Sequence, residues 1–400
     1  MLKEIRIKNF RSIEAAEVSL APITVLYGPT SSGKSSLLYS MLVLKNFLIN
    51  PNRQADALFH LGFMDLGGFA ACVFNHEPQR KIGISIKSTN VSELASYGLD
   101  FSKTEGYVHK AIGDFEMEAT VNLPYGQNQN FPFTYTENDE TYTLNWNGII
   151  CQSVIPTKPT AETQKRAQEI ATLFNESIEI LKTIDVAPHR RGFFKSFYAP
   201  GPTSPIPTTE EEVATIIISD PYLPARISTY TTQIFDRDFR TSVFPGTASF
   251  SFQATDNKSR IPVELVNEGF GVNQVIYILA KMLRVDVGTI LLEEPEVHLH
   301  PTVIRSFARA LSIFITEERK QVICTTHSEQ FLIALLTAVA DGFLKRDDIR
   351  CYLVTKEKKS TDFKKQEVNN NGQIEDGLTS FMEAQVEDLK RFLSDKKKNG

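Results

Sequence analysis

The stretch Gly28-Pro29-Thr30-Ser31-Ser32-Gly33-Lys34-Ser35 fits the pattern G-x-x-x-x-G-K-[ST]. In this pattern the glycines allow backbone N–H groups to close around phosphate oxygens. The apolar run at residues 23–27 predicts a buried strand before the loop, and residues 36–44 predict a helix after it. Because a helix N-terminus adds its positive dipole end, strand, loop and helix together predict a phosphate-binding site. A chance match in a Gly/Ser-rich turn is the alternative, and the flanking elements argue against it.

The motif assigns tasks to individual residues of the loop. Lys34 is expected to reach the β- and γ-phosphates of ATP, and the Ser35 hydroxyl to ligate Mg²⁺. ATP and Mg²⁺ are therefore the expected cofactors. The residues expected to contact the nucleotide are Gly28, Pro29, Thr30, Ser31, Ser32, Gly33, Lys34, Ser35 and Ser36.

Length and composition predict a globular protein of more than one compact unit. The chain has 400 residues, more than one core usually holds, with 42% hydrophobic and 23% charged residues. A net charge of −5 gives no overall attraction to nucleic acid, so any DNA contact needs a local basic patch. The sequence has neither a membrane-spanning apolar run nor a signal peptide's apolar core. The four cysteines form no C-x-x-C pair, which fits a reduced cytoplasm and no zinc site.

The order of the expected elements predicts an α/β fold. Residues 1–79 carry the strands around the phosphate loop, and residues 261–356 alternate apolar strands with helical patterns. We therefore expect one mixed or parallel sheet formed from both ends of the chain. Residues 80–260 are expected to form an inserted lobe of peripheral elements, and residues 357–400 a C-terminal hairpin, helix and tail.

The inserted lobe changes character along its length. Alternating apolar and polar residues at 80–155 predict antiparallel strands, and residues 160–184 have helical periodicity. The proline-rich segment 199–207 is expected to be irregular. Thr208 and Glu211 are expected to form a capping box that opens another helix.

An acidic pair ends a buried strand late in the chain, in the run Leu291-Leu292-Glu293-Glu294-Pro295. In P-loop proteins a carboxylate at this place holds Mg²⁺, and a neighbouring carboxylate can activate the attacking water. We therefore expect Glu293 on the Mg²⁺ side and Glu294 as the general base. A solvated acidic turn is the alternative for this run taken alone.

Several motifs together resemble the ABC-type chromosomal ATPases of the RecF, SMC and overcoming-lysogenization-defect (OLD) group. Residues 291–301 are similar to their Walker B and D-loop, and residues 267–274 to their signature motif. Residues 325–328 are similar to their switch-histidine segment, and residues 2–12 to the opening strand and turn. The order and spacing of these motifs agree with that group. The resemblance implies that the α/β fold is a P-loop NTPase head of the ABC type.

The resemblance implies a composite site in an ATP-dependent homodimer. One copy supplies the phosphate loop, and the other supplies signature N–H groups, here those of Gly269 and Gly271. His327, at the end of a strand, is expected to contact the γ-phosphate, although a buried core histidine is the alternative. Lys34, Glu294 and His327 are thus the expected catalytic residues.

Three further features of the sequence each allow two interpretations. Glu294, Glu296, His298 and His300 alternate along one segment and would suit a metal, but a D-loop explains the same residues. The run Pro188-His189-Arg190-Arg191-Gly192 is either a phosphate-binding patch or an interface or solvated loop. Arg11 either approaches the nucleotide or serves the fold.

The function expected from these motifs is ATP hydrolysis by a cytoplasmic dimeric switch acting in DNA repair or antiviral defence. The alternative is a nucleotide-gated scaffold with negligible hydrolysis, and a transporter ATPase subunit fits the inserted lobe less well. DNA and a separate effector protein are candidate partners, and no membrane is expected. Only 73 residues follow His327, so neither a toprim domain nor nuclease activity is expected in this chain.

Overall fold

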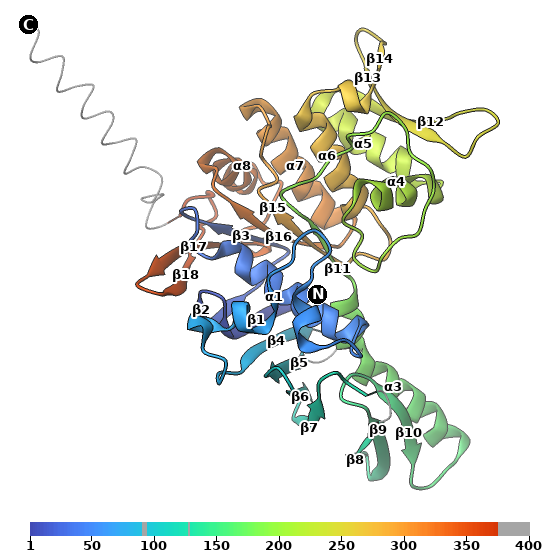
Figure 1. Ribbon diagram of the computed structural model, residues 1–400, viewed down its shortest axis with the longest axis vertical. Coiled ribbons are helices and arrows are strands. Elements are labelled where there is room, and N and C mark those ends of the chain that lie inside the picture. Colours follow the sequence, from blue (N-terminus) through green and yellow to red (C-terminus); the bar gives the residue numbers. More distant parts are fainter. Residues whose placement is uncertain (90–93, 127–128, 375–400) are drawn as a thin grey trace, which may run out of the picture.

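The computed structural model describes residues 1–89, 94–126 and 129–374, and its central element is a six-stranded sheet (Figure 1). Five strands run parallel, and β18 pairs antiparallel with β17 at one edge. In sheet order the strands are β11 (Ile184–Ala187), β15 (Thr289–Glu293), β16 (Gln321–Thr326), β3 (Ile23–Tyr27), β17 (Ile349–Glu357) and β18 (Ser360–Gln366). Because β3 lies between β16 and β17, the two ends of the chain build one mixed sheet, and the predicted fold class is confirmed.

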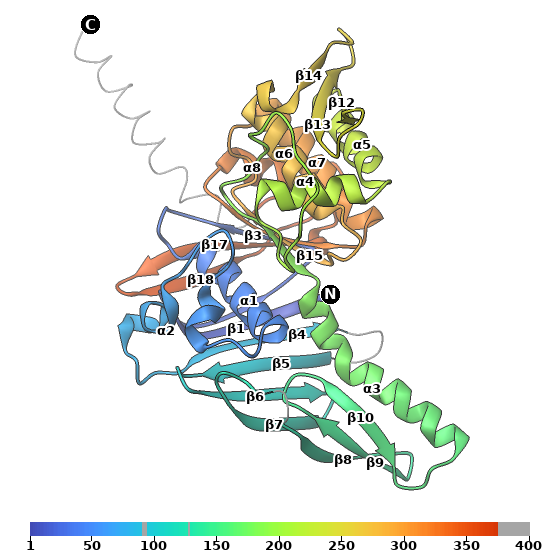
Figure 2. The ribbon, with the colours of Figure 1, turned by 45° about the vertical axis from the view of Figure 1, so that its right-hand side comes forward.

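A second six-stranded sheet is antiparallel and begins at the N-terminal hairpin (Figure 2). In sheet order its strands are β2 (Ile13–Ser19), β1 (Leu2–Phe10), β4 (Ile82–Thr89), β5 (Leu94–Phe101), β6 (Glu105–Ile112) and β7 (Phe115–Asn122). Two three-stranded sheets complete the strands. They contain β8 (Phe131–Glu137), β9 (Glu140–Trp146) and β10 (Cys151–Pro156), and β12 (Arg237–Val243), β13 (Phe250–Asp256) and β14 (Pro262–Glu264).

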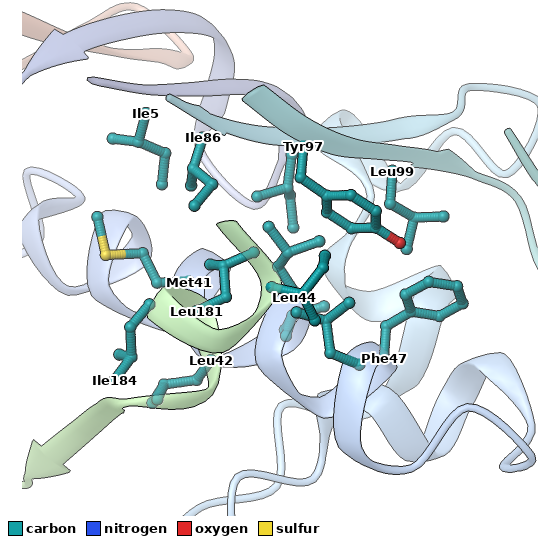
Figure 3. Close-up of a cluster of buried hydrophobic side chains, with 14 of the residues drawn as sticks. Ile5, Met41, Leu42, Leu44, Phe47, Ile86, Tyr97, Leu99, Leu181 and Ile184 are labelled. Atoms are coloured by element: carbon teal, nitrogen blue, oxygen red, sulfur yellow. The ribbon is translucent and has the colours of Figure 1, made fainter. Parts of the chain in front are cut away.

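Helix α1 (Lys34–Ile49) follows the phosphate loop and is buried along almost its whole length. Its apolar side chains, among them Met41, Leu44 and Phe47, face Ile86 and Tyr97 of the antiparallel sheet (Figure 3). A helix that is apolar on all sides is stable only when it is enclosed. The apolar side chains around α1 form a first core cluster. This cluster therefore holds the phosphate loop, which precedes α1, between the central sheet and the antiparallel sheet.

Helix α2 packs in the same core cluster as α1, whereas α4 to α8 pack in a second cluster on the opposite face of the central sheet. Helices α6, α7 and α8 pack with β15 and β16 in this second core cluster. Helix α3 runs out from the core beside β10 (Figure 2). The bounds are α2 (Gly68–Cys72), α3 (Ala161–Lys182), α4 (Glu210–Ser219), α5 (Leu223–Phe235), α6 (Phe270–Met282), α7 (Pro301–Glu317) and α8 (Glu329–Ala340).

Two expectations for the inserted region differ from the structure. The capping box is formed by Thr209 and Glu212, because Thr209 accepts from the Glu212 N–H at 3.2 Å, one residue later than predicted. Residues 184–187 are not peripheral: they form β11, which pairs with β15 in the central sheet. Four residues after a long helix give too short a pattern to be recognised as a strand.

Near the C-terminal end of the described residues, Val368 and Ile374 are paired across a small turn, as the predicted hairpin requires. The helix expected within residues 380–393 lies outside the described residues. The division into a core, an inserted lobe and a C-terminal part stays a prediction. None of the described helices combines the length and apolar character needed to cross a membrane.

Candidate nucleotide site

The phosphate loop connects β3 to α1 and requires glycine at both ends. Gly28 has φ +141° and Gly33 has φ +103°, and both values are unfavourable for residues with a Cβ atom. A Cβ on Gly28 would lie 2.3 Å from the Val354 carbonyl oxygen, and one on Gly33 would lie 2.2 Å from Thr361 Oγ1. Val354 of β17 and Thr361 of β18 therefore pack directly against the loop.

Lys34 is the first residue of α1, and its ammonium group turns back toward the loop. Its Nζ donates to the carbonyl oxygens of Gly28 at 2.9 Å and Pro29 at 2.8 Å. The residue is 5% exposed, and burial lowers the pKa of its ammonium group to about 8. The Lys34 ammonium group therefore lies where a bound phosphate group could pair with its charge.

Tyr39 connects the two expected Mg²⁺ ligands. Its hydroxyl donates to Glu293 Oε1 at 2.7 Å and is also hydrogen-bonded to the Ser35 side chain. A hydroxyl and a carboxylate are oxygen donors of the kind that Mg²⁺ prefers. Since both contact the same Tyr39 oxygen, the structure brings Ser35 and Glu293 together, and the donor set fits the ion.

A chain of polar contacts joins Glu294 to Lys34 through His327. His327 Nε2 lies 3.1 Å from Glu294 Oε1, and its Nδ1 lies 3.4 Å from Lys34 Nζ. Because an ammonium group only donates, Nδ1 accepts and Nε2 carries the proton. Burial and the neighbouring Lys34 charge lower the pKa of His327, so the imidazole is neutral at pH 7. Lys34 and Glu294, the other two expected catalytic residues, thus both contact His327.

Glu296 is a buried carboxyl group beside this chain. Its Oε1 accepts from the Thr326 hydroxyl, whereas its Oε2 has no hydrogen-bond partner among the residues that the structure describes. Burial raises the pKa of Glu296 to about 6, and the Glu294 charge adds to the rise. From the sequence, Glu296 was predicted to belong either to a D-loop or to a metal cluster, and neither prediction includes this buried carboxyl group beside the catalytic residues.

The metal-cluster alternative has no support in the side-chain positions. His298 packs against Phe270 with ring centroids 5.6 Å apart, and His300 caps α7 by accepting from the Thr302 N–H. Within residues 1–89, 94–126 and 129–374, no group of three His, Cys, Asp or Glu side chains is arranged to hold a metal. The structural role of residues 294–300 is therefore to connect the end of β15 to the start of α7.

A cavity of about 800 Å³ opens over the phosphate loop and is lined by basic side chains. Arg11 lies on one side, with its guanidinium 5.4 Å from the centre of the Tyr39 ring. Lys356 comes from the end of β17, and Lys358 and Lys359 come from the turn between β17 and β18. No Asp or Glu appears among the described lining residues, so the cavity suits a polyanion. The three lysines were missed, since nothing in their sequence relates them to residue 34.

The signature residues lie elsewhere. Gly269 caps the N-terminus of α6, and Gly271 begins its first turn. Both line a second cavity of about 620 Å³ together with His298 and His300. The structure therefore brings Lys34, Ser35, Glu293, Glu294 and His327 together and leaves Gly269 and Gly271 outside that group.

Two family matches cover most of the chain. Residues 1–185 match the family described as "AAA ATPase domain". Residues 159–334 match the family described as "AAA domain, putative AbiEii toxin, Type IV TA system". Both descriptions name an AAA domain, and together the two matches place the chain among the AAA-type ATPases. ATP binding by its phosphate loop follows from this family.

The chain is also similar to solved structures of SMC head domains. An SMC head domain from Thermotoga maritima matches at 11% identity and TM-score 0.46, covering 92% of this chain and 99% of the other. An Smc head with an extended coiled coil, bound to the C-terminal domain of ScpA derived from Pyrococcus furiosus, matches at 10% identity and TM-score 0.49, covering 99% of each chain. No curated protein sequence matches significantly.

The AAA ATPase also contains a buried arginine that sequence reasoning misread. Arg191 is 3% exposed and donates to main-chain carbonyls at the end of β15. It is therefore not part of a solvated loop, and it does not face a phosphate-binding surface. Arg190, the preceding residue in the chain, is exposed. Nothing in the sequence distinguishes Arg190 from Arg191. Only the fold shows that one is exposed and the other is buried.

Proposed function

We propose that this AAA ATPase hydrolyses ATP to ADP and phosphate, with Glu294 as the general base. The observation that carries the proposal is the contact chain from Glu294 through neutral His327 to Lys34. In the reaction the water oxygen forms a bond to the γ-phosphorus, while the bond to the β,γ-bridging oxygen breaks. Glu294 accepts the proton of the water, and ADP leaves with the bridging oxygen.

The other residues of the site hold the nucleotide. Lys34 leaves its loop carbonyls to pair with the β- and γ-phosphates, and His327 contacts the γ-phosphate beside Glu294. Ser35 and Glu293 would hold Mg²⁺, which neutralises phosphate charge when it is bound. Arg11 and the hairpin lysines add positive charge on the open side of the cavity.

We further propose that the working form is an ATP-dependent homodimer. Gly269 and Gly271 lie in a cavity separate from the phosphate loop, which supports their use on the nucleotide of a second copy. Phe270, between them, is 60% exposed and lies beside the exposed Phe194, and this pair of apolar side chains at the surface supports a contact there. ATP then closes two copies, and hydrolysis separates them.

The test compares Lys34→Ala and Glu294→Gln with the wild type and with Glu179→Gln, an exposed control on α3. Phosphate release and molecular mass are measured with and without MgATP. The proposal requires turnover in the wild type and control, turnover lost in both site variants, and a stable ATP-bound dimer for Glu294→Gln. Undiminished turnover in Glu294→Gln would exclude it as the base, and a monomer in every nucleotide state would exclude the dimer.

The pathway proposed for this switch is DNA repair or antiviral defence. The family match whose description names a toxin of a Type IV TA system supports a defence role. A separate effector or DNA would then respond to the dimer. Binding of double-stranded DNA at two salt concentrations tests the DNA branch, because phosphate contacts must weaken as salt rises. Binding that is absent or insensitive to salt contradicts it.

A further inference from the structure

Residues 188–193, here named the strap, connect the end of β11 to two parts of the site. The strap lies beside the acidic end of β15 and beside the first turn of α6. The proposed chemistry uses none of its side chains. Its contacts nevertheless reach both Glu293 and Glu294, through the buried Arg191 and the exposed His189.

Arg191 holds the main chain at the acidic end of β15. Its Nη1 donates to the Glu293 carbonyl at 2.5 Å and to the Pro188 carbonyl at 2.9 Å. Its Nη2 donates to the Glu294 carbonyl at 2.7 Å. One planar guanidinium thus fixes the carbonyl of the last residue of β15, the carbonyl of the residue after it, and the start of its own strap.

Glu294 needs such a restraint because its backbone is left-handed, with φ +44°. This conformation is disfavoured for a residue with a Cβ atom and persists only where surrounding contacts impose it. The φ value directs where the Glu294 carboxylate projects. The hydrogen bonds of Arg191 lie on both sides of this residue's Cα and are therefore well placed to maintain it.

His189 adds a second restraint, acting on the carboxylates themselves. Its N–H donates to Glu293 Oε2 at 3.3 Å, and its Nδ1 lies 3.5 Å from Glu294 Oε2. His327 approaches the other oxygen of Glu294. The carboxylate of Glu294 is therefore held between two imidazoles, one from the strap and one from the end of β16.

The far end of the strap is joined to α6. The Phe193 N–H donates to Asn273 Oδ1 at 2.7 Å, and Asn273 Nδ2 donates to the Phe193 carbonyl at 2.7 Å. Asn273 belongs to the first turn of α6, directly after Gly269 and Gly271. A displacement of that turn is consequently transmitted to the strap through two buried hydrogen bonds.

We propose that the strap couples the first turn of α6 to Glu294, with Arg191 as the positioning residue. The proposal rests on the proposed dimer, in which α6 faces the nucleotide of the second copy. Closure on that nucleotide then adjusts Glu294 in the same chain that supplies α6. Hydrolysis at one nucleotide is in this way linked to occupancy of the other.

The test uses the full chain with Arg191→Met and Arg191→Lys, and Arg190→Met as the adjacent exposed control. For Arg191→Met we expect MgATP affinity within about threefold of wild type and turnover at least tenfold lower. Arg191→Lys should recover part of the turnover. Hydrogen exchange should become faster at the amides of Glu294 and Val297, which donate to the carbonyls of Thr325 and Glu294.

The outcomes separate positioning from other roles. Unchanged exchange at these amides in folded Arg191→Met overturns the proposal. An equal effect of Arg190→Met overturns it too, because charge alone would then explain the loss. Faster exchange throughout the protein, with affinity and turnover falling together, indicates only a structural role and also counts against it.

A second variant tests the coupling to α6. Asn273→Ala should speed exchange at Glu294 as well as in the first turn of α6. If the change stays within α6, the strap does not transmit it, and the coupling is wrong. If the wild type hydrolyses no ATP, the proposed enzyme fails, while the exchange measurements still decide whether the strap positions Glu294.

Discussion

Lys34 shows how a single residue prepares the phosphate loop for its ligand. Its ammonium group is enclosed and is satisfied by two carbonyls of the loop. Burial penalises its charged form, so the pKa of the group falls to about 8. A bound triphosphate would reverse this penalty, because its negative charge favours the protonated amine. Nucleotide binding should therefore be coupled to proton uptake.

This coupling predicts a pH dependence of nucleotide affinity. Above pH 8 the free protein increasingly carries neutral Lys34, so the affinity for MgATP should fall by up to about tenfold per pH unit. Titration calorimetry in buffers of different ionisation enthalpy at pH 8.5 should reveal proton uptake. In Lys34→Arg the side chain stays charged, and the pH dependence should disappear. Persistence of the same dependence in that variant would assign it to another group.

A second prediction at this scale concerns Glu296 and stability. The pKa of Glu296 is raised to about 6 in the folded chain, so the folded state binds more protons than the unfolded state between about pH 4.5 and 6. Its stabilising contribution is complete below pH 4.5 and is lost as the pH rises through 6. Glu296→Gln should therefore gain up to about 2 kcal/mol relative to the wild type on going from pH 4.5 to pH 8. Urea unfolding at both pH values measures the difference, and an equal difference at both contradicts the assignment.

At the scale of elements, β11 and α6 are held together by buried charges. Lys281 of α6 is fully buried, and its Nζ donates to Asp185 of β11 at 2.8 Å and to the Pro207 carbonyl. Arg284 Nη1 pairs with the other Asp185 oxygen at 2.9 Å. The irregular proline-rich segment is thereby attached to the central sheet through Lys281.

Breaking this arrangement should destabilise the protein. Lys281→Ala removes one cation from a buried pair and leaves Asp185 and the Pro207 carbonyl underpartnered, which typically costs about 3–5 kcal/mol. Urea unfolding monitored by circular dichroism measures the loss. The exposed pair Lys182 and Glu179 provides the control, since Lys182→Ala should change stability by less than about 1 kcal/mol. A loss for Lys281→Ala as small as that control would show that solvent or Arg284 compensates fully.

The sequence predicted elements with strong local patterns and missed relations between distant residues. Residues 23–27 and the loop after them are recognisable because strand, glycines and helix are contiguous. Strand β11 was missed because four residues give no periodicity. Arg191 was misread because its partners, the carbonyls of Glu293 and Glu294, are about 100 positions away and carry no side-chain signal. The lysines of the β17–β18 hairpin were missed for the same reason.

At the scale of the whole molecule, the nucleotide site joins the two halves of the core. The phosphate loop and α1 belong to the first apolar cluster, whereas α6, α7 and α8 belong to the second. Glu293, Glu294 and His327 lie at the ends of β15 and β16 on the sheet that separates these clusters. A nucleotide that contacts both groups would therefore stabilise both halves at once.

Thermal unfolding with MgADP tests this view of the whole chain. At a ligand concentration of 100 times Kd, binding to the folded state alone adds about 2.7 kcal/mol. We expect one transition that shifts to higher temperature, because the two halves share the central sheet. Lys34→Ala should show no shift. A shift confined to one of two resolved transitions would show that the halves unfold independently.

The position of β3 within the central sheet has a consequence for synthesis on the ribosome. This strand emerges early, but its neighbours β16 and β17 begin at residues 321 and 349. At a translation rate of about 5–20 residues per second, both edges of β3 wait roughly 15–60 s for their partners. During that interval an apolar strand with unpaired backbone groups is available to chaperones and to other nascent chains. The nucleotide site can consequently form only after β16 and β17 have been synthesised, long after the phosphate loop itself.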